Sequence, residues 1–350
     1  MNQTCAAGNR GREPDLVVGL DAGGTRTRAV LADLRDGRPR GEGTSGPGNA
    51  LTVPGPDLAD HLTETLAAAV PEPLRGRVAA VAGGFAGAGH RGQGADEPGR
   101  VRARTALSTA LARLGITAAH TGVHSDIETA FAAAPGHPAD GLVLVAGTGA
   151  VAARVAARVP AATSGGDGWL LGDDGSGFWI GRAAVRAALR AADGRGGPTA
   201  LVRAVGLALG LPPELLPPEE YGGPDTVHWS ATRRTAYRAR LLPAVMDRPP
   251  VRLADHAPLV VDAAEEKDTV AAEILREAAR RLAGTVSALA PRPGEPLVVT
   301  GGLLAPHGPL LASLTEGLAP LELTVVPVSD GSPGAVALAR LAALAHGPRP

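Results

Sequence analysis

A carboxylate, two glycines and a hydroxyl lie close together in the segment Asp21-Ala22-Gly23-Gly24-Thr25. Because glycine has no Cβ, its backbone N–H groups can come close to an anion. A carboxylate beside such a turn suits a hydrated divalent cation, which keeps several waters and takes few protein ligands. The segment therefore suggests a site for phosphate and a metal ion, although these residues alone fit an ordinary hairpin equally well.

The same layout occurs a second time in the chain. Leu16–Asp33 predicts a strand, a glycine turn and a returning strand, and Leu142–Arg158 repeats this pattern around Gly147-Thr148-Gly149-Ala150. A third strand ends in a further glycine turn, Gly301-Gly302. Three such turns, two of them in equivalent hairpins, indicate a duplicated architecture with several backbone sites for a nucleotide.

Strands and helices must hold these turns, and hydrophobic periodicity locates them. Further strands are expected at Arg38–Ser45, Val78–Val81, Ile116–His124, Leu297–Thr300 and Leu321–Pro327. Helices are expected at Asp57–Val70, Val101–Leu114, Ser125 (as N-cap) to Ala134, Phe178–Ala192, Thr199–Leu209, Arg233–Met246, Val251–Val261, Ala264–Leu289, Pro309–Leu318 and Gly334–His346. This alternation predicts an α/β fold.

Composition excludes several classes of function. With 34 basic and 35 acidic residues the formal charge is −1, which provides no basic surface for nucleic acid or an anionic membrane. A membrane-spanning segment needs roughly 18 apolar residues, and no such run or signal peptide is present, so a cytoplasmic protein is expected. The single cysteine, Cys5, excludes a disulfide or a cysteine-held cluster within one chain. The single lysine, Lys267, follows two glutamates and forms no P-loop motif.

The order of the three glycine turns resembles the phosphate and adenosine motifs of the superfamily that contains actin, hexokinase and heat-shock ATPases. Within it, residues 15–346 resemble the BadF/BadG/BcrA/BcrD-type ATPases, and most of all the N-acetylglucosamine kinases of that family. The resemblance implies a two-domain actin-like ATPase fold, made of duplicated ribonuclease H-like domains with a nucleotide cleft between them. We therefore expect a disordered leader at 1–13, an N-terminal domain at 14–124, a C-terminal domain with a helical insertion at 125–330, and a C-terminal helix at 331–350 that packs back on the N-terminal domain.

The resemblance also implies roles for individual residues. Asp21 would orient Mg²⁺ through water. The ATP-binding residues would be Gly23, Gly24, Thr25, Thr148, Gly149, Gly301 and Gly302. Asp126 would be the general base that accepts a proton from the sugar hydroxyl. The residues around the sugar would be Asn49, Asp126, Gly149, Ala150, Gly166, Asp167 and Asp173.

Each role has a plain structural alternative. Asp126 follows Ser125 and could be an acid that favours a helix start. Asn49 follows a Pro-Gly pair and could be a turn residue. Either Asp173 or Asp174 could be a solvated turn residue, and Trp169 could stack on a sugar or simply pack.

Two departures from the kinases of the family concern the acceptor. Those kinases usually have serine where this chain has Ala150, and often tryptophan where it has Asp167. The expected reaction is transfer of phosphate from ATP to the 6-hydroxyl of N-acetylglucosamine, in a homodimer with no nucleic-acid or membrane partner. Glucosamine, N-acetylmuramate and an anhydro sugar are alternative acceptors. A reductase-activating ATPase and a non-catalytic sugar-sensing regulator are the rival functions on the same fold.

Overall fold

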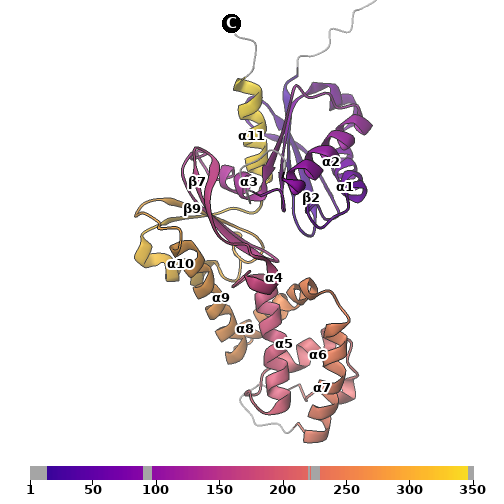
Figure 1. The fold of residues 1–350 in the computed structure, drawn as a ribbon, viewed down its shortest axis with the longest axis vertical. Coiled ribbons are helices and arrows are strands. Elements are labelled where there is room, and N and C mark those ends of the chain that lie inside the picture. The colour runs from indigo at the N-terminus through magenta and orange to yellow at the C-terminus, as the bar shows by residue number, and fades with distance from the viewer. Residues whose placement is uncertain (1–13, 90–96, 220, 222–228, 346–350) are drawn as a thin grey trace, which may run out of the picture. The chain divides into compact units, whose positions relative to one another are not determined.

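The computed structural model describes residues 14–89, 97–219, 221 and 229–345 (Figure 1). Its chain divides into two compact units, which are Met1–Pro138 with Asp330–Pro350, and Ala139–Ser329. The segment after His124, expected in the second domain, therefore lies in unit 1 because its helix packs on strands of that unit. The leader expected at 1–13 lies outside the described residues.

Unit 1 is built on a mixed five-stranded sheet. Its strands are β1 (Leu16–Ala22), β2 (Thr27–Asp33), β3 (Pro39–Ser45), β4 (Val78–Phe85) and β5 (His120–Ser125). Their order across the sheet is β3-β2-β1-β4-β5. The pairs β1–β2 and β2–β3 are antiparallel, whereas β4 and β5 run parallel to β1.

Helices cover both faces of this sheet. They are α1 (Gly55–Ala69), α2 (Pro98–Leu114), α3 (Asp126–Ala132) and α11 (Ser332–Ala345), with a short 3₁₀ helix η1 (Glu72–Arg77). Side chains alternate along β1, so Leu16, Val18 and Leu20 join the core beneath α1 and α2, while Val17 packs with Val336 of α11. The α11 helix therefore returns the end of the described chain to the first strand (Figure 1).

Unit 2 repeats the same plan. Its strands are β6 (Gly141–Ala146), β7 (Ala150–Ala156), β8 (Val159–Gly165), β9 (Pro296–Thr300) and β10 (Thr324–Pro327). Their order is β10-β9-β6-β7-β8, with the same pattern of antiparallel and parallel pairs as in unit 1. This equivalence confirms the α/β class and the duplication predicted from the two hairpins.

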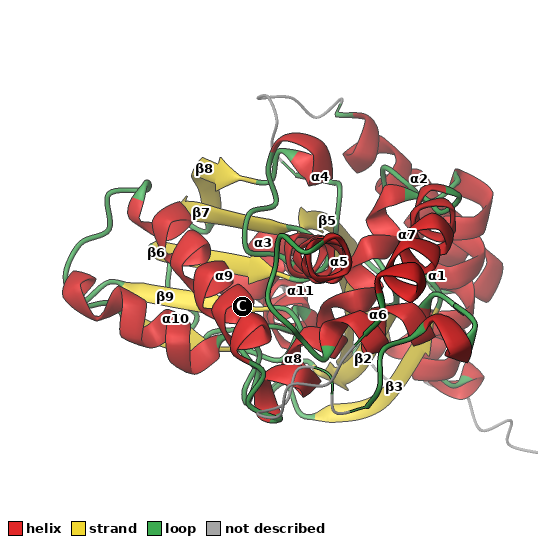
Figure 2. Ribbon diagram, turned by 90° about the horizontal axis from the view of Figure 1, so that it is seen from below, coloured by secondary structure: helices red, strands yellow, loops and turns green. Residues whose placement is uncertain are grey.

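The helices of unit 2 include a large insertion after the hairpin strands. They are α4 (Gly168–Leu171), α5 (Gly177–Asp193), α6 (Leu201–Ala208), α7 (Ala231–Met246), α8 (Ala257–Glu265), α9 (Thr269–Ser287) and α10 (Leu311–Leu318), with 3₁₀ helices η2 (Pro213–Leu215), η3 (Pro250–His256) and η4 (Ala319–Leu321). The α9 helix contacts β7 and β8, and α10 packs beside α9 (Figure 2). One core joins these helices to the sheet.

The break between the helices expected at Val251–Val261 and Ala264–Leu289 lies later in the structure, at 266–268. The α8 helix ends at Glu265, Lys267 has a positive φ of 69°, and α9 begins after Asp268. The Asp268 carboxylate accepts hydrogen bonds from the N–H groups of Val270 and Ala271, both at 2.9 Å. An N-cap at the end of a run of charged residues thus starts the second helix.

Two strands also differ from the prediction. Strand β8 lies outside the expected strands, because most of its residues are exposed and it lacks an apolar alternation. Strand β4 continues to Phe85, through Gly83 and Gly84. Glycine is needed there because a Cβ on Gly84 would lie 2.1 Å from Oγ1 of Thr129.

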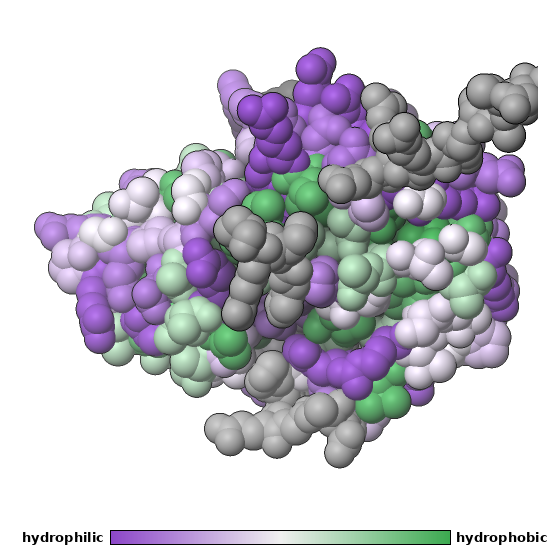
Figure 3. Space-filling model, turned by 90° about the horizontal axis from the view of Figure 1, so that it is seen from above, coloured by the Kyte–Doolittle hydropathy of each residue, from purple (hydrophilic) through white to green (hydrophobic). Residues whose placement is uncertain are grey.

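Within the described residues, no helix is both long and apolar enough to cross a membrane. On the face seen in Figure 3, hydrophobic residues form small groups among hydrophilic ones.

Candidate functional site

The first glycine turn lies between β1 and β2 of unit 1. The Gly23 N–H donates to Arg26 O at 2.9 Å, and the Gly48 N–H donates to Gly23 O at 2.8 Å. Neither Gly23 nor Gly24 has a positive φ, and a Cβ on Gly24 would meet nothing within 4 Å. Gly24 and Thr25 are exposed. The fold itself therefore does not require glycine at position 24, and this leaves room for a ligand to approach the backbone.

Asp21, the last residue but one of β1, accepts a hydrogen bond from a residue near the C-terminal end of the described chain. Its Oδ2 accepts a hydrogen bond from the N–H of Gly331 at 3.0 Å. Burial raises the pKa of Asp21, the Gly331 hydrogen bond lowers it, and the charge of Asp330 raises it again, with a net increase. A bound cation would favour the ionised form of this carboxylate.

Asp126 is the first residue of α3, directly after β5. Its Oδ1 accepts a hydrogen bond from the Ile127 N–H at 3.0 Å. Burial and the charge of Asp21 raise the pKa of Asp126 to about 6, despite its place at a helix N-terminus. The structure thus brings Asp21 and Asp126 into one electrostatic environment, with Asp126 able to accept a proton near neutral pH.

The start of α3 is fixed by a capping box. Ser125 Oγ accepts from the Glu128 N–H at 3.2 Å, and Glu128 Oε2 accepts from the Ser125 N–H at 2.7 Å. Burial alone would raise the pKa of Glu128, but hydrogen bonds from His124 and Ser125 outweigh it and lower this pKa to about 2. Arg100 also reaches Glu128 Oε2 at 3.3 Å. Ser125 is therefore the cap, as expected, and Asp126 is not needed for that task.

Asn49 follows Gly48 in the loop after β3. Its Oδ1 accepts from the N–H groups of Leu51 at 2.9 Å and Thr52 at 3.2 Å. This turn role was the structural alternative considered for Asn49. Because the side-chain oxygen already accepts these two hydrogen bonds, a ligand here would bind to the side-chain NH₂ group.

The second glycine turn, in unit 2, is fastened to Asp173. The Ala150 N–H donates to Asp173 Oδ1 at 3.1 Å, and a Cβ on Gly149 would lie 2.8 Å from that oxygen. Asp173 has a φ of +55°. The neighbouring Asp174 pairs with Arg281 at 3.0 Å. Asp173 thus positions the turn that contains Thr148 and Gly149.

Helix α5 begins against the same turn. The Gly177 N–H donates to Gly147 O at 2.8 Å, and the Phe178 N–H donates to Thr148 O at 3.0 Å. Ser176 caps the helix through the Trp179 N–H. The Gly- and Asp-rich segment therefore connects the second turn to a 17-residue helix.

The third turn, at Gly301-Gly302, lies beside the second one. Gly301 has a φ of +97°, and a Cβ there would lie 2.2 Å from Ala146 O. Gly302 has no positive φ, and its Cβ position meets nothing within 4 Å. Gly301 is thus required by the backbone, whereas Gly302 resembles Gly24 and Gly147 in having open space where a Cβ would be.

The remaining predicted sugar residues follow β8. The Gly166 N–H donates to Ala150 O at 2.9 Å, which places it beside the second turn. Asp167 is exposed. Trp169 is 41% exposed, and its ring lies 6.0 Å from that of Phe178, so it packs within unit 2.

The predicted residues thus fall into two groups, one in each unit. Unit 1 holds Asp21, Gly23, Gly24, Thr25, Asn49 and Asp126, and unit 2 holds Thr148, Gly149, Ala150, Gly166, Asp167, Asp173, Gly301 and Gly302. Sequence reasoning missed Asp330 and Gly331, which surround Asp21. Asp330 pairs with Arg28 at 2.7 Å and accepts from the Ser332 N–H at 2.8 Å. An Asp-Gly-Ser run before a helix is a usual N-terminal signal, but it does not reveal a partner so far away in the chain.

Solved structures share this fold at low sequence identity. A proposed N-acetylglucosamine kinase from Chromobacterium violaceum is 24% identical, with a TM-score of 0.63 over 93% of this chain and 98% of that one. A second such protein, from Porphyromonas gingivalis, is 19% identical, with a TM-score of 0.69 over 93% and 99%. A ROK-family glucokinase from Streptomyces griseus, solved with glucose and AMPPNP, is 21% identical, with a TM-score of 0.53 over 93% and 99%.

These likenesses confirm the two-domain actin-like ATPase fold. None of the curated proteins matches the sequence. A family model matches residues 18–339, which include both sheets and all three glycine turns. The chain belongs to the BadF/BadG/BcrA/BcrD ATPase family.

Proposed function

We propose that this protein is an ATP-dependent amino-sugar kinase that phosphorylates the 6-hydroxyl of N-acetylglucosamine. The observation that carries the proposal is Asp126, a carboxylate with a pKa raised to about 6 beside Asp21. An enzyme that only hydrolyses ATP has less need of a base tuned for a sugar hydroxyl. Similarity to the two proposed N-acetylglucosamine kinases supports the choice of acceptor.

In the proposed reaction Asp126 accepts the proton of the sugar 6-hydroxyl as its oxygen attacks the γ-phosphorus of ATP. The new O–P bond forms while the bond from the γ-phosphorus to the bridging oxygen breaks, and ADP leaves with that oxygen. A positioned base of this kind contributes about 10²–10⁴-fold to the rate. Catalysis otherwise depends on positioning and on neutralising phosphate charge.

The glycine turns would bind the nucleotide. The proposed phosphate-binding residues are Gly23, Gly24, Thr25, Thr148 and Gly149, through their N–H and hydroxyl groups, and the proposed adenosine-binding residues are Gly301 and Gly302. Gly24, Gly147 and Gly302 each leave open space where a Cβ would stand, which supports close approach of a ligand.

The residues around Asp21 fit a hydrated Mg²⁺. Mg²⁺ in proteins is commonly bound by one or two carboxylates together with substrate phosphates and waters. Asp21 would hold such an ion through water, with Gly331 fixing the carboxylate. When bound, Mg²⁺ would supply positive charge to the phosphates.

The sugar would be recognised by polar groups. The Asn49 amide and Asp126 are the proposed contacts from unit 1, and Gly149, Ala150, Gly166, Asp167 and Asp173 are those from unit 2. Ionised Asp173 is a hydrogen-bond acceptor only. It would accept from sugar hydroxyls as well as from the Ala150 N–H.

A second candidate acceptor is glucosamine, because Asp167 is an exposed acid where related kinases often have tryptophan. A carboxylate favours a free ammonium group over an N-acetyl group. An Asp167→Trp variant should then lose activity with glucosamine more than with N-acetylglucosamine. If the variant and the parent turn over both sugars equally, this preference is wrong.

The test is a coupled ADP-release assay with N-acetylglucosamine, glucosamine, N-acetylmuramate and an anhydro sugar. Rapid release with N-acetylglucosamine, and a 6-phosphate product by mass spectrometry and NMR, supports the proposal. Equal release without sugar indicates a bare ATPase of the activator type. Sugar binding by calorimetry without ADP release indicates a sensor. Light scattering tests the proposed homodimer.

A further inference from the structure

A cluster of positive charge lies in unit 2, outside the residues assigned to ATP and sugar. It lines a surface pocket of about 480 Å³ between α5, the loop after it and the start of α9. Three arginines line it, of which Arg186 and Arg190 come from α5 and Arg195 from the loop. All three are exposed.

Two of these arginines lack a counterion in the described part of the chain. Arg195 pairs with Asp193 at 2.5 Å. The guanidinium groups of Arg186 and Arg190 form no hydrogen bond or ion pair there. They stand one helical turn apart on α5, a spacing at which like charges repel each other. An anion between them would relieve that repulsion.

The acids near the pocket are already engaged. Glu273, which also lines it, pairs with Arg276 of the same helix. Asp268, at the N-cap of α9, accepts from Val270 and Ala271 N–H through Oδ1, and from Thr199 Oγ1 and Ala200 N–H through Oδ2. The pocket thus retains two uncompensated positive charges.

The floor of the pocket is apolar. Ala183 and Ala187 from α5 and Val270 and Ile274 from α9 line it, and all four are half-buried. A ligand with two negative charges and a small organic body would match both features. A phosphate monoester has this composition, with nearly two charges near pH 7.

We propose that this pocket binds a phosphate monoester, with its phosphate between Arg186 and Arg190 and its organic group on the apolar floor. The guanidinium groups suit this role because they form paired hydrogen bonds to phosphate oxygens. The site is separate from the glycine turns, since α5 begins at the second turn and the pocket lies toward its other end.

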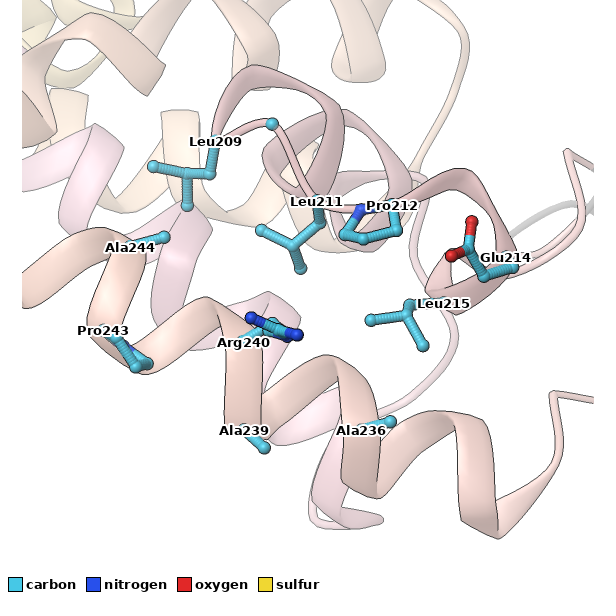
Figure 4. A pocket seen from close by; sticks show the side chains of 11 residues that line it. Leu209, Leu211, Pro212, Glu214, Leu215, Ala236, Ala239, Arg240, Pro243 and Ala244 are labelled. Atoms are coloured by element: carbon cyan, nitrogen blue, oxygen red, sulfur yellow. The ribbon is translucent and has the colours of Figure 1, made fainter.

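Another pocket in unit 2 provides a control. It has a volume of about 830 Å³ and lies between η2 and α7, where leucine, proline and alanine side chains surround the single arginine Arg240 (Figure 4). One arginine in a largely apolar pocket does not match a dianion. Arg240→Ala therefore removes an exposed arginine of the same unit without affecting the proposed site.

The experiment is calorimetric titration of the full chain with phenyl phosphate, and with inorganic phosphate for comparison. We expect saturable binding of phenyl phosphate, tighter than that of inorganic phosphate, and unchanged within about twofold in Arg240→Ala. The double variant Arg186→Ala/Arg190→Ala should weaken phenyl phosphate binding at least tenfold. Its circular dichroism and melting temperature should match the parent, because both side chains are exposed.

The variant Gly24→Ala separates this pocket from the first glycine turn, and it should bind phenyl phosphate as the parent does. The proposal is overturned if the parent shows no saturable binding, or if the double arginine variant binds as tightly as the parent. Loss of binding in Gly24→Ala but not in the double variant would place the phosphate at the glycine turn and would also overturn it.

Discussion

The N–H of Gly331 donates a 3.0 Å hydrogen bond to Oδ2 of Asp21, across 310 positions of sequence. A Cβ on Gly331 would lie 2.8 Å from Thr129 Oγ1 and 3.3 Å from the Asp21 carboxyl carbon. The backbone of Gly331 is therefore packed directly against the proposed metal-binding carboxylate. Only a residue without a side chain leaves that carboxylate where it is.

Gly331→Ala should displace the Asp21 carboxylate and impair phosphate transfer more than folding. We expect kcat/KM for ATP to fall by about 10–100-fold, because small displacements of positioning groups have effects of this size. More Mg²⁺ should be needed for half-maximal ADP release. Gly76→Ala is the matched control, since its Cβ would meet nothing within 4 Å. Equal kinetics in the two variants would contradict the role of Gly331.

Asp126→Asn should reduce kcat by about 10²–10⁴-fold while the KM for sugar changes little. In the parent, the rate should fall as pH drops below about 6, because the raised pKa leaves Asp126 protonated there. ADP release measured between pH 5 and 8 tests both statements. A parent rate that stays constant down to pH 5 would argue against Asp126 as the base.

Asp126→Asn should also stabilise the folded state at high pH. A raised pKa means that the folded protein holds this proton more tightly, so stability is lost as pH rises from 3.8 towards about 6. Because Asp126 is only half-buried, we expect Asp126→Asn to gain about 1–2 kcal/mol at pH 8 and nothing below pH 4. Urea unfolding at the two pH values measures this difference. A gain of equal size at both would point to a cause other than titration.

Glu128→Gln should destabilise unit 1 in the opposite pH range. The lowered pKa means that the Glu128 carboxylate stabilises the fold above pH 4.5, and that this contribution is lost as pH falls towards about 2. We expect a loss of about 1–3 kcal/mol at pH 7, because charged hydrogen bonds to buried partners are of that strength. The difference from the parent should shrink near pH 2.5. Glu316→Gln, on the exposed side of α10, serves as the control and should change nothing.

The glycine turns should separate ligand effects from folding effects. Gly24→Ala and Gly147→Ala should leave the melting temperature almost unchanged, because their Cβ positions are open, but should raise the KM for ATP about tenfold or more. Gly301→Ala should instead lower stability by about 1–3 kcal/mol, since its φ is +97° and its Cβ would lie 2.2 Å from Ala146 O. Melting curves with and without ATP distinguish the two classes. An unfolded Gly24→Ala protein would refute the assignment of that glycine to a ligand.

Much of the fold could be predicted because it rests on local patterns. The hairpins around Gly23 and Gly147 have apolar strands on both sides, and Ser125 with Glu128 is a recognisable capping box. The break before α9 was placed too early, at 262–263, because charged residues such as Glu265 and Glu266 are also compatible with the exposed first turn of a helix, and only the hydrogen bonds of Asp268 fix the helix start. Strand β8 was missed because edge strands carry little hydrophobic signal.

The site was predictable only in part, for a different reason. The neighbouring residues in the sequence are enough to identify Asp21 and Asp126 as candidate site residues. Their electrostatic environment, however, depends on segments that are distant in sequence. Neither the Gly331 hydrogen bond to Asp21 nor the Asp173 hydrogen bond to Ala150 has a local signature. Asn49 shows the converse. Its local turn signal, an Asn after a Pro-Gly pair, predicts a turn residue, and its side-chain oxygen does accept a hydrogen bond within the turn.

The contact between Asp21 and Gly331 also affects the order of events during translation. At roughly 5–20 residues per second, the ribosome needs tens of seconds to make the residues between them. Unit 1 can therefore be completed only after the whole of unit 2 has been synthesised, because α11 follows unit 2 in the chain. A released chain that ends at residue 329 should hold a folded unit 2 and expose to chaperones the apolar side chains that α11 covers, such as Val17 of β1.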